Sequence, residues 1–255
     1  MPICLTQRSR KTTKLATVWS SYLAPIPVSE LRFEQRGESF SYRPRLKITE
    51  RFFSLQGEGL HAGLPCSFVR LTGCALRCVY CDTEYAFHGG HWQSFDDLEA
   101  WLHDQPTKLV QITGGEPLHQ RAVWPWVDHL IELGFKPLIE TSGAVSIAGL
   151  HPLAHIVMDL KTPDSGECDR NLWSNLEQLK ATDEIKFVIC SRSDLQWAID
   201  TIRCHELDTR FKVLISPEWG VVDKTQLAED LLASGCQARF QLQLHKMIWQ
   251  DARGK

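Results

Sequence analysis

Residues 74–81 of the chain read Cys-Ala-Leu-Arg-Cys-Val-Tyr-Cys, which places three thiols within eight residues. This loop follows the apolar segment Ser67–Leu71, a predicted strand. Three ligands on one tight loop at a strand end favour a metal centre, either zinc or an iron–sulfur cluster. Zinc needs a fourth ligand, for which Cys66, His61 and His88 are candidates. A cluster bound by three thiolates leaves one iron open to another ligand.

The rest of the composition is that of an ordinary globular chain. The protein has 255 residues, of which 43% are hydrophobic and 23% charged, and its net charge is −3. These values exclude collagenous, low-complexity and strongly disordered proteins. No apolar run approaches the ~18 residues of a membrane-spanning helix, and no basic excess indicates a nucleic-acid partner. Nine unevenly spaced cysteines favour reduced thiols in a cytosol over a secreted disulfide framework.

The N-terminal region differs in composition from the rest of the chain. Its first 29 residues contain no Asp or Glu and carry Arg and Lys among many Ser and Thr. This composition is typical of a transit peptide, a disordered tail, or upstream sequence translated from a misplaced start. We expect residues 1–44 to be such an extension and residues 45–255 to form a single domain.

From about Leu46 onward, short apolar segments alternate with amphipathic ones. The predicted strands are Leu46–Phe53, Ser67–Leu71, Leu109–Thr113, Pro137–Glu140, Ile156–Leu160, Ile185–Cys190, Phe211–Ile215 and Phe240–Leu244. Most of them are not strictly alternating, as expected for parallel strands covered on both faces. Helices are predicted after the N-cap Ser94 and over Val123–Leu133, Asp194–Leu207 and Thr225–Ala233. This alternation predicts a parallel α/β sheet or barrel, with functional residues at the carboxyl ends of its strands.

A second motif, Thr113-Gly-Gly-Glu-Pro117, ends the strand predicted over Leu109–Thr113. Two glycines after a strand allow a ligand to approach the backbone closely, and Glu116 adds a carboxylate. A Cys-x3-Cys-x2-Cys loop with an aromatic residue before its last Cys, followed by this motif, resembles the radical S-adenosylmethionine (SAM) superfamily. The resemblance implies a partial TIM-like parallel β/α barrel. It also implies a [4Fe-4S] cluster whose open iron binds SAM, with the methionine end of SAM held by the Gly-Gly-Glu segment.

Further segments narrow the resemblance to one family. They are Phe53-Ser-Leu-Gln-Gly-Glu-Gly59, Arg70, Asp82-Thr83, Glu140-Thr-Ser-Gly143, Asp159-Leu-Lys-Thr-Pro163 and Leu244-His-Lys246. From about Leu46 to Trp249 the chain resembles the 7-carboxy-7-deazaguanine synthases. This implies a lyase that converts 6-carboxy-5,6,7,8-tetrahydropterin to 7-carboxy-7-deazaguanine with loss of ammonia, in queuosine and 7-deazapurine biosynthesis.

The resemblance assigns the cluster and SAM sites residue by residue. Cys74, Cys78 and Cys81 would bind the cluster, and Thr83 would contact Mg²⁺. Because the reactive radical comes from SAM, no side chain is assigned as a catalytic residue. The residues implied to contact SAM are Gly115, Glu116, Asp159, Leu160, Lys161, Ser216 and Pro217. Asp159 stands where some members of the family have Ser, so its contact is expected to differ.

The substrate side is assigned in the same way. The implied contacts are Leu55, Gln56, Gly57, Arg70, Thr113 and His245. Arg70 would pair with the carboxylate of the pterin, for which a bidentate guanidinium is suited. Residues 250–255 continue past the His-Lys segment near which chains of the family tend to end. This extension puts into question a role for a terminal carboxylate.

The resemblance also implies a cytoplasmic homodimer that receives electrons from a carrier such as a flavodoxin, with neither nucleic acid nor membrane as partner. Two alternatives remain. One is a radical SAM activase that installs a glycyl radical on a partner protein. The other is a zinc-binding α/β protein. The activase would not need the segment Gln56–Gly59 together with Arg70, which suit a small carboxylate substrate.

Overall fold

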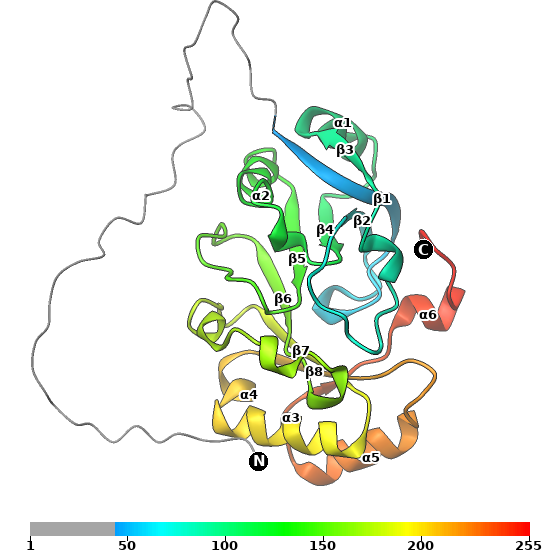
Figure 1. Cartoon of the computed structure of the whole chain (residues 1–255), viewed down its shortest axis with the longest axis vertical. Coiled ribbons are helices and arrows are strands. Elements are labelled where there is room, and N and C mark those ends of the chain that lie inside the picture. The colour runs from blue at the N-terminus through cyan, green and yellow to red at the C-terminus, as the bar shows by residue number, and fades with distance from the viewer. Residues whose placement is uncertain (1–43) are drawn as a thin grey trace, which may run out of the picture. The chain divides into compact units, whose positions relative to one another are not determined.

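The computed structural model describes residues 44–255, so the expectation for residues 1–44 lies outside the described residues except at Pro44. In this part of the chain one open sheet has the strand order β3-β1-β2-β4-β5-β6-β7-β8-β9 (Figure 1). The strands are β1 (Arg45–Leu55), β2 (Pro65–Leu71), β3 (His91–Ser94), β4 (Leu109–Gly114), β5 (Lys136–Thr141), β6 (His155–Asp159), β7 (Glu184–Ile189), β8 (Lys212–Pro217) and β9 (Arg239–Phe240).

Strands β2, β4, β5, β6, β7, β8 and β9 are neighbours in this order and pair in parallel, as the strand–helix alternation predicts. The sheet does not close, because β3 and β9 are its two ends. The partial TIM-like barrel is therefore confirmed. The first strand departs from the parallel pattern, since β1 pairs antiparallel with both β2 and β3. Its sequence contains no feature that sets its direction.

Five of the six helices in the described residues lie between consecutive strands, and the sixth follows the last strand. The six helices are α1 (Phe95–His103), α2 (Val123–Glu132), α3 (Arg192–Cys204), α4 (Leu207–Arg210), α5 (Lys224–Ser234) and α6 (Leu244–Trp249). The predicted cap at Ser94 is confirmed, because its side chain accepts from the backbone N–H of Asp97 at 3.1 Å in a capping box. Helix α5 ends as expected at Gly235, which has a φ of 69°.

Three sequence predictions differ from the structure. The predicted strand Phe240–Leu244 is wrong beyond Phe240, because the backbone N–H of Leu244 donates to the Gly57 carbonyl and begins α6. The helix expected to reach Leu207 ends at Cys204, since Glu206 has a φ of 53° and interrupts it. Strand β3 was not predicted. It is an edge strand whose polar and aromatic residues carry no clear pattern.

Alternate residues on the parallel strands face two different environments. On β4, Val110 and Ile112 join the hydrophobic core beneath the helices, whereas Gln111 and Thr113 face the interior of the partial barrel. On β7, Phe187 belongs to the core and Lys186 faces the interior. The core therefore lies between the sheet and the helices, and the barrel interior is left for polar side chains. None of the helices in residues 44–255 is long and apolar enough to span a membrane.

Candidate active site

The interior of the partial barrel holds a cavity of about 720 Å³. Every site residue predicted from the sequence lines it, except Glu116 and Leu160. The cavity brings together residues that are widely separated in the sequence, from Phe52 on β1 to Lys255. The carboxyl ends of the parallel strands form its wall, as expected for this fold class.

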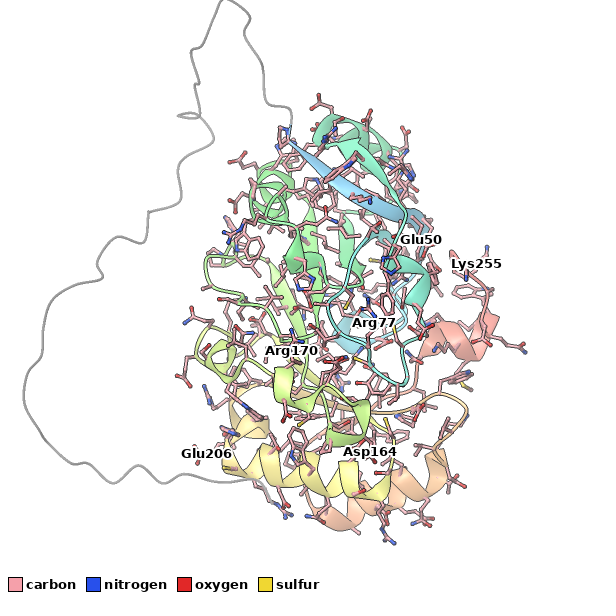
Figure 2. All side chains as sticks on the ribbon, viewed as in Figure 1. Glu50, Arg77, Asp164, Arg170, Glu206 and Lys255 are labelled. Carbon is pink, nitrogen blue, oxygen red and sulfur yellow. The ribbon has the colours of Figure 1, made fainter. Side chains whose placement is uncertain are left out.

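The cysteine loop leaves the carboxyl end of β2 and is held by the segment that follows β6. The backbone N–H of Arg77 donates to Glu167 Oε1 at 2.6 Å, and that of Val79 to the Ser165 carbonyl at 3.1 Å. The Arg77 guanidinium, labelled in Figure 2, lies 4.2 Å from the centroid of the Phe87 ring. These contacts fix the loop at the cavity edge, with Cys74, Cys78 and Cys81 half-buried and unoxidised.

The thiols of the loop are poised for a metal rather than for acid–base chemistry. Burial raises the pKa of Cys74 and of Cys81, and it raises that of Cys78 to about 11. The nearby Lys161 charge opposes this shift at all three positions. The thiols therefore stay protonated at neutral pH until a metal displaces their protons, as in other thiolate sites.

The geometry does not favour a single zinc ion on this loop. Within residues 44–255, one group of three ligands lies close enough for one ion, and it contains no cysteine. Cys66 is buried in β2 and packs near Leu109 and Leu138, while His88 is exposed. His61 lies beside His155 instead of the loop. Three thiols with one position left open fit an iron–sulfur cluster better.

The two glycines of the Thr113–Pro117 motif allow β4 to pack against the start of the cysteine loop. Gly114 has a φ of 146°, and a Cβ there would collide with the backbone of Leu71. A Cβ at Gly115 would collide with the Gly73 carbonyl and crowd Cys74. The bare backbone therefore forms a cradle beside the thiols, which fits the methionine end of a SAM molecule bound to the cluster.

Glu116 lies behind this cradle rather than in the cavity. Its carboxylate is fully buried and accepts bonds from the backbone N–H of Leu118 at 2.9 Å, from the Thr141 hydroxyl at 2.9 Å and from the Ser142 N–H at 2.7 Å. It therefore ties the Gly-Gly turn to the end of β5. Leu160 is buried as well and does not line the cavity. Neither side chain is placed to contact SAM directly.

On the cluster side of the cavity, Asp159 carries an acceptor without a partner. Lys161 Nζ bonds to Asp159 Oδ2 at 2.8 Å, and this contact outweighs burial and raises the pKa of Lys161. The other oxygen, Asp159 Oδ1, is buried and accepts no bond among the described residues. A buried acceptor of this kind is costly unless a ligand satisfies it. A hydroxyl or ammonium group of SAM would do so.

Arg70, which also lines the cavity, is held by Glu50. Arg70 Nε donates to Glu50 Oε1 at 2.7 Å, and the Tyr85 hydroxyl donates to the same oxygen at 2.8 Å. The terminal nitrogens of the guanidinium have no partner in the described part of the chain. They remain available for a carboxylate of the substrate.

The predicted magnesium position lies next to an ion pair. The Thr83 hydroxyl donates to Asp82 Oδ1 at 2.7 Å, and Lys246 Nζ lies 2.6 Å from Asp82 Oδ2. Burial alone would raise the pKa of Asp82, but Lys246 lowers it to about 2, so the carboxylate stays charged. Asp82 and Thr83 thus offer oxygen ligands of the kind that Mg²⁺ accepts.

Sequence reasoning missed Lys186, the central charge of the cavity. Its Nζ lies 2.8 Å from Glu58 Oε2 and 2.7 Å from Glu140 Oε1. Burial alone would raise the pKa of Glu140, but the Lys186 charge lowers it to about 2. The available signal was a lysine between Ile185 and Phe187 in an otherwise apolar strand. Such a residue is rarely buried without a partner.

The end of the chain enters the same cavity. Residues 250–255 contribute to its lining, and the Arg253 guanidinium lies 4.1 Å from the centroid of the Tyr85 ring. His245 lines the cavity too, and a Cβ at Gly57 would collide with its ring. Burial lowers the pKa of His245. Residues 250–255 are therefore part of the cavity wall, and they bring the Arg253 guanidinium to it.

Comparisons with known proteins agree with these features. A family model described as the radical SAM superfamily matches residues 68–207. The chain is 41% identical over 219 residues to the 7-carboxy-7-deazaguanine synthase of Koribacter versatilis. The aligned region covers 80% of this chain and 97% of that protein. It is 43% identical over 205 residues to the synthase of Methanospirillum hungatei, over 80% of this chain and 85% of the relative. A crystal structure of QueE from Escherichia coli has a TM-score of 0.66 and 26% identity, covering 79% of this chain and 95% of that one.

Proposed function

The chain belongs to the family of 7-carboxy-7-deazaguanine synthases within the radical SAM superfamily, and we propose how its cavity serves the family's reaction. The enzyme is a radical SAM lyase of 7-deazapurine biosynthesis. We propose that its substrate is 6-carboxy-5,6,7,8-tetrahydropterin, which it converts to 7-carboxy-7-deazaguanine with loss of ammonia. One observation carries this proposal: the cysteine loop and Arg70, whose guanidinium is held by Glu50, line a single cavity.

The residues at the cluster end fit the groups that the family uses. Cys74, Cys78 and Cys81 would hold a [4Fe-4S] cluster, and the Gly114–Gly115 backbone with Asp159 would hold SAM. When bound and reduced, these groups supply a radical that takes a hydrogen atom from the substrate. Lys161, Ser216 and Pro217 line the same end and would shape the SAM pocket.

The chain's own residues orient the substrate and keep water away. Arg70 would pair with the pterin carboxylate, while Leu55, Gln56, Gly57, Thr113 and His245 would fix the ring. Gln56 is itself fixed, because its Nε2 donates to Gln111 Oε1 at 2.8 Å. The Glu58–Lys186–Glu140 group supplies a polar floor in which one cation bridges two carboxylates. Such fixed surroundings limit side reactions of a reactive intermediate.

Further partners are proposed on the resemblance to the family. Mg²⁺ would bind at Thr83 and complete its shell with substrate oxygens and water. A reduced carrier such as a flavodoxin would donate electrons. The cysteine loop offers it an accessible face, because Val79 is 71% exposed. We also propose a cytoplasmic homodimer with no nucleic-acid partner.

The experiment that tests the function compares two substrates in the reconstituted enzyme under anaerobic conditions. With dithionite, SAM and Mg²⁺, the carboxylated tetrahydropterin should yield 7-carboxy-7-deazaguanine, and the same pterin without its carboxylate should yield none. A glycyl-radical activase would need no pterin. If neither pterin yields a deazapurine, the proposal is therefore contradicted.

Replacing Arg70 with Ala should weaken substrate binding. A lost hydrogen bond to a charged group costs about 1.5–3 kcal/mol, which corresponds to a roughly 10- to 150-fold rise in KM. Steady-state kinetics with the pterin measures this change, and kcat should fall less than kcat/KM. Arg121→Ala, at an exposed position, is the control and should keep the wild-type KM. An unchanged KM in Arg70→Ala would remove Arg70 from the site.

Arg253 should contribute to the substrate end through Tyr85. A cation–π contact contributes about 0.5–2 kcal/mol, and part of this energy positions Tyr85 for the substrate, so Arg253→Ala should raise KM by at most about 30-fold. Deleting residues 250–255 should have at least the same effect, because it also opens the cavity wall. The matched control is Arg239→Ala at the exposed start of β9. If the deletion leaves KM at the wild-type value, the extension has no part in the site.

A further inference from the structure

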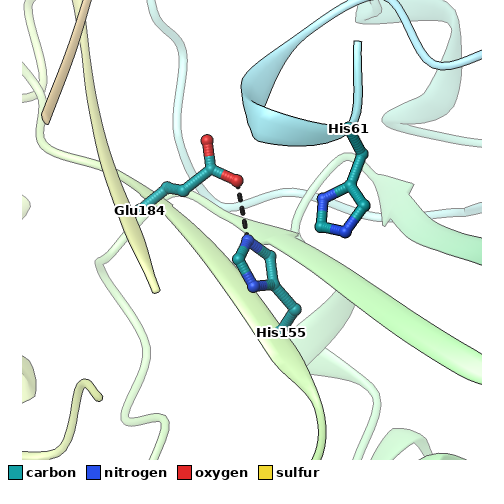
Figure 3. Close-up of side chains that lie close together, drawn as sticks. All are labelled: His61, His155 and Glu184. Carbon is teal, nitrogen blue, oxygen red and sulfur yellow. Dashed lines mark hydrogen bonds and ion pairs between the residues drawn. The ribbon is translucent and has the colours of Figure 1, made fainter. Parts of the chain in front are cut away.

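A second group of ligating side chains lies apart from the cavity lining. His61, His155 and Glu184 place their ligand atoms within 4.8 Å of one another. Figure 3 shows the two rings and the carboxylate converging from three segments. His61 ends the short 3-10 helix η2 (Gly59–His61), while His155 and Glu184 begin the neighbouring strands β6 and β7.

Glu184 is a fully buried carboxylate that is held by two hydrogen bonds. Its side chain is fully buried, and Oε1 lies 2.7 Å from His155 Nε2. Oε2 accepts the backbone N–H of Leu60 at 2.9 Å. His155 is the only ionisable side chain that pairs with this carboxylate in the described residues. A buried carboxylate is stable only when it is paired, either with a cation or with a metal.

The positions of the three side chains suit a transition-metal ion. Two imidazoles and one carboxylate form a common ligand set for zinc. Tetrahedral zinc with bonds of about 2.0–2.1 Å sets its ligand atoms about 3.3 Å apart. The His155–Glu184 distance of 2.7 Å needs a small widening, and the His61 ligand atom must move closer from within 4.8 Å, by at most about 1.5 Å. The Leu60 N–H would keep Glu184 oriented, as outer-shell donors do in metal sites.

The location of the group gives it a structural consequence. Residues 56–61, here the crossing segment, run from β4 to β9 across the barrel interior. Gln56 bonds to Gln111 on β4, Glu58 bonds to Lys186 on β7, and the Gly59 N–H donates to Gln241 Oε1 just after β9. Gly59 has a φ of 72°, and a Cβ there would crowd Glu184, so the backbone approaches the carboxylate closely. The far end of this segment is His61.

We propose that His61, His155 and Glu184 form a binding site for a divalent transition-metal ion such as zinc. The ion fastens the crossing segment to β6 and β7. It binds outside the cavity, takes no part in the radical chemistry, and does not depend on the identity of the pterin substrate. Its fourth ligand is water or another solvent molecule, as in sites with three protein ligands.

The test uses the cluster-loaded enzyme, so that the cysteine loop is occupied by iron. The protein is dialysed anaerobically against zinc and then against zinc-free buffer, and bound zinc and retained iron are measured together. We expect one zinc per chain with the iron content unchanged. Zinc at 100-fold above its Kd should also raise the melting temperature by roughly 5–10 °C.

Three variants separate this site from other sources of zinc binding. His61→Gln removes one ligand while it leaves the His155–Glu184 pair intact, and His155→Gln removes a second. Both should lose the bound zinc and the zinc-dependent shift in melting temperature. His151→Gln, four residues before His155 and outside the group, should retain both.

Two results would overturn the proposal. One is a wild-type enzyme that keeps its iron but retains no zinc. His61, His155 and Glu184 would then be only a hydrogen-bonded cluster. The other is His61→Gln that binds zinc and gains stability as the wild type does. The iron content and zinc-free melting temperature of each variant report separately on whether it folds.

Discussion

Cys78→Ala loses the iron–sulfur cluster and, with it, all SAM cleavage and all product. Cys78 is the middle thiol of a loop that offers three ligands, so its removal leaves two thiolates for a cluster that normally takes four ligands. The neighbouring Cys74 and Cys81 cannot move to compensate. The backbone N–H groups of Leu76 and Thr83 donate to the sulfur atoms of Cys74 and Cys81, respectively. Glu167 and Ser165 accept the backbone N–H groups of the residues between these two cysteines. Iron and sulfide content, together with SAM cleavage measured by chromatography, report the loss.

The matched control for this prediction is Cys168→Ala. Cys168 is half-buried like the loop cysteines but lies outside the cavity lining. It should keep wild-type iron content and activity. Full iron loading and SAM cleavage in Cys78→Ala would contradict the assignment of Cys78 as a cluster ligand.

Lys186→Met should destabilise the fold by about 3–5 kcal/mol. Only 6% of the Lys186 side chain is exposed, and its Nζ bonds to both Glu58 and Glu140. Methionine has a similar length but no charge, so two partly buried carboxylates would lose their common cation. Urea unfolding followed by circular dichroism measures the change in the free energy of unfolding.

Two further variants distinguish charge from packing at this position. Lys212→Met, at the exposed start of β8, should change the free energy of unfolding by less than about 0.5 kcal/mol. Adding Glu140→Gln to Lys186→Met should recover part of the loss, because one uncompensated charge is removed. Lys186→Met with wild-type stability would show that the three side chains do not act as a charged group.

The fold was largely predictable because strands and helices alternate along the sequence. The segment Leu109–Thr113 is apolar, ends in a Gly-Gly turn, and forms β4 one residue longer than predicted. Most predicted strands lie within two residues of the observed ones. The direction of β1 was not predictable, because it depends on pairing across the β1–β2 turn and not on the residues of β1 themselves.

The candidate site was predictable where a motif carries it. The cysteine loop and the glycine pair have spacings that few other sites use, and the cavity contains both. Lys186 was not identified, and Glu58 was quoted in a motif without a role of its own, because their roles arise from a contact across 128 positions in sequence. The same holds for the His61 group. Its members are single residues at the ends of three separate segments, and no local spacing relates them.

The family assignment resolves the alternatives that the cysteine spacing left open. The relatives are 7-carboxy-7-deazaguanine synthases over most of their length, and an activase is not favoured by any of them. The cavity is consistent with this, since it combines a cluster loop with a held guanidinium. Cys78→Ala tests the cluster ligands, and Arg70→Ala and Arg253→Ala test the substrate end of the cavity.

The most direct measurement is the amount of 7-carboxy-7-deazaguanine formed per chain. The reconstituted enzyme receives reductant, SAM, Mg²⁺ and 6-carboxy-5,6,7,8-tetrahydropterin, and the product is identified by its mass. We expect several molecules of 7-carboxy-7-deazaguanine per chain, with release of one ammonia for each. Cleavage of SAM without any deazapurine, in an enzyme with a full complement of iron, would contradict the central claim.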